Sequence, residues 1–88
     1  MDIRVVINQC GAALELHGGI SEYPVTLLLL SPTRLEWYRS QMAEQNPDMR
    51  HANISQVAMF AAKRLVPSGD LNPHIWTYNA SENKYSRA

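Results

Sequence analysis

The alternation of apolar and polar positions predicts four β-strands along the chain. Apolar residues recur at every second position over residues 3–8 and 12–17, which is the period of a half-buried strand. Residues 9–11 have the composition of a turn, so we expect these two runs to form a hairpin. The mostly apolar run of residues 25–30 is too short to cross a bilayer and indicates a buried third strand. Residues 74–79 alternate again and predict a last strand.

The residues between the third and last strands predict two helices. Ser31 can accept hydrogen bonds from first-turn amides and Pro32 suits the first helical position, so the first helix should cover residues 32–45. Asn53 followed by Gln56 is a capping-box pattern for a second helix. Its apolar stripe at helical spacing consists of Ile54, Val57, Ala58, Ala61 and Leu65.

This order of elements, βββααβ, predicts an α+β fold. We expect a mostly antiparallel sheet of about three to four strands with two helices on one face. We expect a single domain over residues 1–80 and a polar, flexible tail over residues 81–88. Two helices can cover only one face of such a sheet, so the opposite face should be open to a partner.

The leucine run predicts one residue of this open face. Successive side chains of a strand point to opposite faces, so Val25, Leu27 and Leu29 share one face and Leu28 occupies the other. We expect the group of three to lie under the helices. Leu28 is then left on the open face, where it would contact a second copy of the chain or another partner.

Aromatic residues extend the set of candidate partner contacts. Trp37 falls beside the main apolar stripe of the first helix, where it is either the flank of a wide core stripe or an exposed binding anchor. His74, Trp76 and Tyr78 share one face of the last strand, which is either a core face or a partner face. We take these four residues, together with Leu28, as candidate partner-binding residues.

Composition and charge narrow the classes of function. The 88 residues include eight basic and eight acidic ones, which gives a net charge of zero, and neither sign forms a run. This balance does not favour a nonspecific nucleic-acid binder, which needs a cationic surface. The sequence has no secretory signal pattern and no membrane-spanning run, and Cys10 is its only cysteine. We therefore expect a cytoplasmic protein with no membrane contact and no internal disulfide.

Candidate chemistry is sparse in this sequence. The three histidines and Cys10 lack the paired spacing of zinc ligands, so we expect no metal and no other cofactor. The acidic residues are scattered singly, which does not support a catalytic pair of carboxylates. We expect no catalytic residues, and a small enzyme is the least favoured function.

One family resemblance offers an alternative. The strand of residues 25–30, followed by helices over 32–45 and 53–66, resembles the ribbon-helix-helix DNA-binding unit in the order of its elements. The resemblance implies a dimer that inserts paired strands into the major groove. Such strands present polar or basic side chains to base edges, whereas Thr26, Leu28 and Leu30 offer one hydroxyl and two hydrocarbons.

Protein binding is therefore the preferred function. We expect a small non-catalytic module that acts as a regulator, inhibitor or accessory protein, of the kind carried by phages and other mobile elements. Its partner is another protein, it forms a homodimer, and it binds through an apolar and aromatic surface. A dimeric DNA-binding regulator is the alternative.

Overall fold

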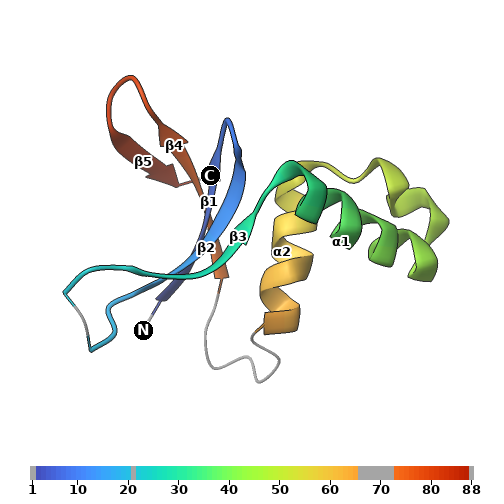
Figure 1. The fold of residues 1–88 in the computed structure, drawn as a ribbon, viewed down its shortest axis with the longest axis horizontal. Coiled ribbons are helices and arrows are strands. Elements are labelled where there is room, and N and C mark those ends of the chain that lie inside the picture. Colours follow the sequence, from blue (N-terminus) through green and yellow to red (C-terminus); the bar gives the residue numbers. More distant parts are fainter. Residues whose placement is uncertain (1, 21, 66–72, 88) are drawn as a thin grey trace.

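The computed structural model describes residues 2–20, 22–65 and 73–87 (Figure 1). One sheet contains β1 (Asp2–Asn8), β2 (Gly11–His17), β3 (Val25–Leu30), β4 (Pro73–Asn79) and β5 (Lys84–Arg87). The helices are α1 (Pro32–Gln45), the short 3-10 helix η1 (Pro47–His51) and α2 (Ile54–Leu65). The strand order is β3-β2-β1-β4-β5, so β3 and β5 form the two edges of the sheet. The predicted α+β class is confirmed.

The direction of β4 differs from the expectation. β1 and β2 form the predicted hairpin, and β2 pairs antiparallel with β3. β4 pairs with β1 in the parallel direction, so the sheet is mixed rather than antiparallel. A tight hairpin forces antiparallel strands, but the helical connection between β3 and β4 is long enough to allow either direction.

The C-terminal residues also differ from the expectation. Lys84–Arg87, predicted to lie in a polar tail, form β5 and pair antiparallel with β4. The rings of Tyr78 and Tyr85 lie opposite each other across this pair, with centroids 5.1 Å apart. Aromatic pairs of this kind stabilise a hairpin even when most of its side chains are exposed. Residue 88, at the end of the expected tail, is outside the described residues.

Both helix starts lie where the sequence predicts them. The Ser31 hydroxyl accepts a hydrogen bond of 3.2 Å from the amide of Arg34. The Gln56 amide donates to Asn53 Oδ1 at 2.9 Å, and the Asn53 amide donates to Gln56 Oε1 at 3.0 Å. These side chains satisfy terminal amides that no carbonyl within the helix can reach.

Ser31→Ala should lower the free energy of unfolding by about 1 kcal/mol, because it removes the acceptor of a first-turn amide and leaves the core unchanged. Chemical denaturation followed by circular dichroism measures the change. Thr33→Ala is the control, since Thr33 is exposed inside the first turn. A neutral Ser31→Ala beside a sensitive Thr33→Ala would mean that the helix begins elsewhere.

The hydrophobic core lies between the sheet and α2, which packs against β1, β2 and β4. Three residues of the predicted α2 stripe, Val57, Ala58 and Ala61, are buried in it. Ile54 and Leu65, at the ends of the same stripe, are exposed. The buried alanines allow the helix to approach the strands closely, so a short chain still forms a closely packed centre.

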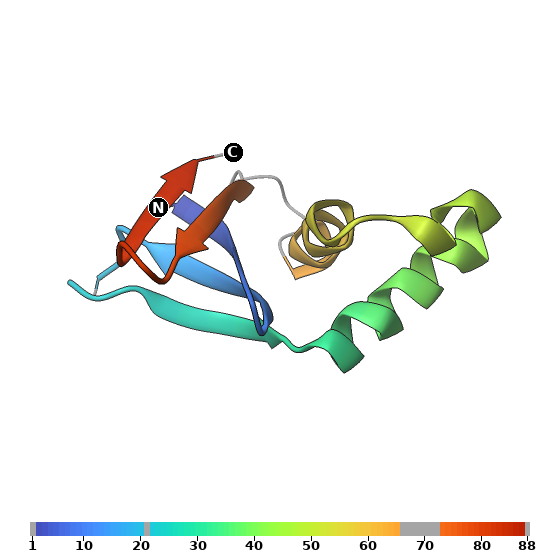
Figure 2. The ribbon, with the colours of Figure 1, turned by 90° about the horizontal axis from the view of Figure 1, so that it is seen from above.

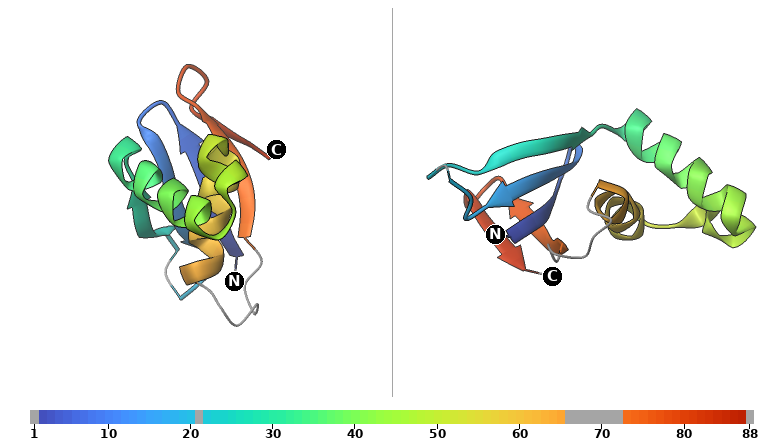
Figure 3. Two further views of the ribbon diagram at one scale, coloured as in Figure 1. Left: turned by 90° about the vertical axis from the view of Figure 1, so that its right-hand side faces the viewer. Right: turned by 90° about the horizontal axis from the view of Figure 1, so that it is seen from below.

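α1 lies further from the sheet than α2 does. It contacts α2, η1 and β3, and it projects away from the strands (Figures 2 and 3). Only Leu35 and Met42 of α1 are buried. In the described parts of the chain, no helix is both long and apolar enough to span a membrane.

Leu28 does not lie on the open face, and the predicted division of the leucine run is therefore wrong. Leu28 is opposite Leu14 in the ladder and packs against the core. Leu30 is buried at the end of β3, where the chain enters α1. Leu28 lies two residues before Leu30, so the alternation of side chains places both on the same face. Leu29 consequently points away from the core.

A β-bulge alters the rest of β3. Leu28 pairs with Leu14, but Thr26 pairs with the following residue Glu15, so Leu27 is an extra residue in the strand. The bulge shifts the alternation by one position. Thr26 therefore shares the open face with Glu15, and its hydroxyl stays out of the core.

Candidate functional site

Exposed apolar side chains gather along β3, at one edge of the sheet. Val25, Leu27 and Leu29 are 46, 39 and 71% exposed, and we call these three residues the β3 edge patch. Within the described part of the chain, β3 has a strand neighbour on one side only. Its outer backbone amides and carbonyls are therefore available to another strand, which could also bury the exposed hydrocarbon.

The two edges of the sheet differ in charge. β3 contains no charged residue, and the nearest ones along the chain are Glu22 and Arg34. β5 carries Lys84 and Arg87. Charged side chains on an edge strand discourage pairing with other chains. β5 therefore has charged side chains that oppose pairing with another chain, and β3 has none. The only irregularity described in β3 is its bulge, where Leu27 is exposed.

The sequence pattern does not predict the β3 edge patch, because it places these residues under the helices. Whether a strand is an edge depends on which strands pair, and that information is not local. One signal is nevertheless present in the sequence. An uncharged stretch that extends from residue 23 to residue 33 is long for a strand with water on one side.

His74, Trp76 and Tyr78 lie together on the sheet face that points away from the helices. Their strand neighbour Ile75 packs against the core, and successive side chains alternate between faces. These three residues therefore do not face the helices, and their role as partner contacts stays a prediction. The open face carries the aromatic residues, and Ile75 belongs to the core side.

On this open face His74 pairs with Asp2 and Arg87, whereas the buried Nε1 of Trp76 has no hydrogen-bond partner in the described part of the chain. His74 Nε2 lies 3.1 Å from Asp2 Oδ1, and its Nδ1 lies 3.1 Å from Nη2 of Arg87. Arginine can only donate, so Nδ1 is the acceptor of the contact with Arg87, and Nε2 is left to donate to the Asp2 carboxylate. Arg4 donates to Asp2 at 3.2 Å, and its guanidinium lies 4.5 Å from the centroid of the Trp76 ring. The network orders the face and occupies both nitrogens of His74.

The sheet curls, so its open face is partly covered by its own strands. Val6 and Ala13 on this face are buried although both helices lie on the other side (Figure 3). Burial raises the pKa of the Tyr85 phenol, and the nearby charge of Glu15 raises it further. Two strands separate β2, which carries Glu15, from β5. Figure 2 shows the strong twist of the sheet between these two strands.

Glu15→Gln should lower the pKa of the Tyr85 phenol, because removal of a nearby negative charge stabilises the phenolate. Ultraviolet titration of the parent and the variant measures the shift, and Tyr85→Phe identifies the contribution of this ring. If the Tyr85 pKa stays the same in Glu15→Gln, the two side chains do not interact, and the curl of the sheet described above is wrong.

Trp37 lies on α1, whereas Trp76 lies on the sheet face that points away from the helices. The ring of Trp37 is 48% exposed and contacts the edge of Tyr38, with centroids 4.9 Å apart. Tyr38 in turn reaches Phe60 of α2. Trp37 therefore flanks the core while remaining accessible. The structure brings together three of the five predicted partner residues and leaves Trp37 and Leu28 apart from them.

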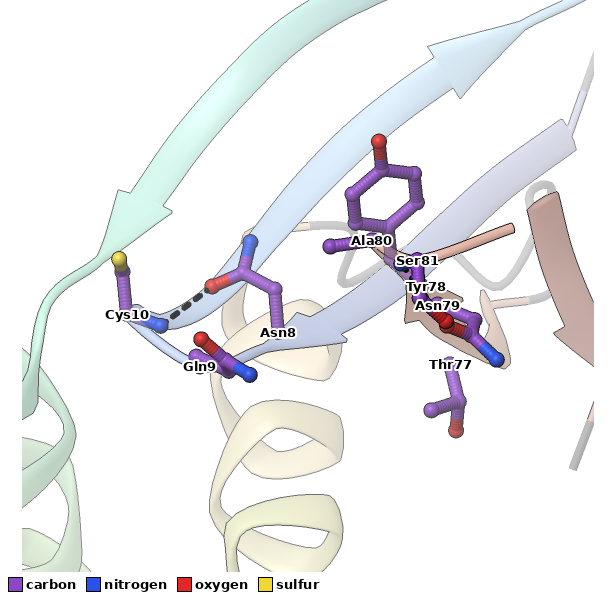
Figure 4. A pocket seen from close by; sticks show the side chains of 8 residues that line it. All are labelled: Asn8, Gln9, Cys10, Thr77, Tyr78, Asn79, Ala80 and Ser81. Atoms are coloured by element: carbon purple, nitrogen blue, oxygen red, sulfur yellow. Dashed lines mark hydrogen bonds between the residues drawn. The ribbon is translucent and has the colours of Figure 1, made fainter. Parts of the chain in front are cut away.

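A hollow of about 540 Å³ lies where the β1–β2 turn approaches the β4–β5 turn (Figure 4). Its amide side chains close the turns: Asn8 Oδ1 accepts from the Cys10 amide at 2.8 Å, and Asn79 Oδ1 accepts from the Ser81 hydroxyl at 2.7 Å. Asn8 and Gln9 separate Cys10 from the other lining residues in Figure 4. The hollow does not place Cys10 beside a histidine that could activate it.

Neither the metal-binding chemistry of the described residues nor similarity to known proteins indicates a function for this chain. Over residues 2–20, 22–65 and 73–87, no group of three or more histidine, cysteine or acidic side chains could hold a metal ion. Comparison of the chain with protein-family models, with curated proteins and with solved structures finds no match. The chemistry of the surface itself must therefore indicate the function.

Proposed function

We propose that this chain is a small non-catalytic protein-binding module that pairs its β3 edge with a strand of another chain. The observation that carries the proposal is the β3 edge patch, where exposed leucine and valine side chains flank unpaired backbone groups. Pairing of a further strand would satisfy these groups and bury the hydrocarbon in one step. A regulator, inhibitor or accessory protein would act by occupying a partner surface in this way.

Two features support binding over catalysis. The titratable groups of the open face pair with one another, as Asp2 does with His74 and Glu15 with His17. A general acid or base needs a free position beside its substrate. The exposed side chains of β3 are hydrocarbon apart from the Thr26 hydroxyl, and none of them is a titratable acid or base.

The chemistry of β3 also favours a protein over DNA as the partner. A ribbon-helix-helix unit would use this strand to read bases, and base edges are read by hydrogen bonds from polar or basic side chains. The residues that β3 exposes are a threonine and apolar side chains. DNA binding stays a prediction that no observation on this strand favours.

Capture experiments with the full chain test the proposal. Immobilised parent, Leu29→Lys and Leu65→Lys are incubated with native lysate, and bound proteins are compared by quantitative mass spectrometry. Self-association is measured in parallel by light scattering. Leu65 is the matched control, because it is an exposed leucine of α2, the helix that packs against β1, β2 and β4.

We expect Leu29→Lys to lose the partner of the parent and Leu65→Lys to keep it. Exchange of β3 amides with solvent should slow in the complex, because strand pairing protects backbone groups. If the parent binds neither another protein nor a second copy, or if Leu29→Lys binds as well as the parent, the proposal is wrong.

A further inference from the structure

We propose that the occupant of the β3 edge is a second copy of this chain. On the basis of the proposed function, two β3 strands pair antiparallel about a two-fold axis and join two five-stranded sheets into one continuous sheet. Such an interface uses the same surface of both copies, as most homodimers do.

The charge distribution selects β3 for self-pairing. No residue between Glu22 and Arg34 is charged, so antiparallel pairing of β3 with its own copy opposes no like charges in any register. Self-pairing of β5 would bring Lys84 of one copy towards Arg87 of the other. The repulsion would oppose that contact, so only one of the two edges is suited to a second copy.

The side chains of β3 also match their own copy. The strand consists of one valine, one threonine and four leucines, so hydrocarbon faces hydrocarbon at nearly every position of a self-pair. A foreign strand would need apolar side chains at the matching positions, whereas a second copy supplies them by symmetry. Burial of Leu29, the most exposed residue of the β3 edge patch, against a symmetry mate removes its hydrocarbon from water.

The surroundings of β3 leave room for the copy. β3 lies at the outer edge of the sheet, and α1 leaves from its end without folding back along that edge (Figures 2 and 3). Six residues of paired strand make a small interface. We therefore expect a dimer that dissociates on dilution, with a dissociation constant in the micromolar range.

Sedimentation velocity and light scattering over a concentration series of the full chain test the dimer. We expect the parent to change from one chain to two with rising concentration. Leu29→Lys should raise the dissociation constant at least ~100-fold, because it buries a charge opposite its own copy. Leu65→Lys should leave it unchanged. Thr26→Lys provides a second edge variant, since Thr26 is already exposed and polar, should Leu29→Lys fail to fold by circular dichroism.

Hydrogen exchange identifies the contact. In the dimer the outer amides of Val25–Leu30 should exchange more slowly at high than at low concentration, and those of Lys84–Arg87 should not. A parent that stays a single chain at all concentrations overturns the dimer but leaves a foreign partner of β3 open. A dimer that persists in both edge variants, or that protects β5 instead, overturns the assignment to β3.

Discussion

Gly11→Ala should destabilise the fold by about 2–6 kcal/mol. Gly11 has a φ of +131°, a conformation that an alanine adopts only with strain of about 1–3 kcal/mol. A Cβ at this position would also overlap the carbonyl oxygen of Leu30, which belongs to the backbone of β3 and cannot rotate away. Overpacking of this kind costs about 1–3 kcal/mol more. Chemical denaturation followed by circular dichroism measures the loss.

Gly18→Ala separates the two causes. Gly18 also has a positive φ, of +73°, but nothing lies within 4 Å of the position that a Cβ would take. It should therefore show the backbone strain alone, a loss of about 1 kcal/mol. Equal effects of the two substitutions would mean that β2 does not approach the end of β3 as closely as the structure shows.

Leu28→Glu should destabilise the monomer by about 3 kcal/mol or more. Leu28 packs against the core cluster, so the substitution removes buried hydrocarbon and brings a carboxyl group into an apolar environment. Unfolding is measured in dilute solution, where any dimer has dissociated. A folded, stable Leu28→Glu would return this residue to the open face that the sequence pattern suggests.

Leu29→Glu is the matched control for Leu28→Glu. Leu29 is the next residue along the same strand, but its side chain points away from the core and is mostly exposed. The monomer should therefore keep its stability within about 0.5 kcal/mol. The contrast between neighbouring leucines measures which face of β3 is buried.

The sequence by itself determines the local features of this protein. Ser31 and Asn53 begin the two helices as predicted, because a capping side chain bonds to an amide only three residues away. The hairpin of β1 and β2 follows in the same way from two alternating runs joined by a short turn. Each of these features depends on interactions between residues that are close along the chain.

The candidate site is only partly predictable. His74, Trp76 and Tyr78 share a face because they alternate along one strand, which the sequence shows directly. That this face lies opposite the helices is known only from Ile75, which packs against the core. The β3 edge patch was not predictable, because the edge is defined by the strands that do not pair with it.

The tertiary structure alone decided the direction of β4, the formation of β5 and the faces of the leucine run. Residues on distant strands must meet in register for each of these, and many registers satisfy the same local pattern. In β3, the burial of Leu30 sets the face of Leu28, and the bulge at Leu27 then shifts the residues before it. A shift of one residue exchanges the two faces of a strand, so alternation predicts a strand but does not show which side is buried.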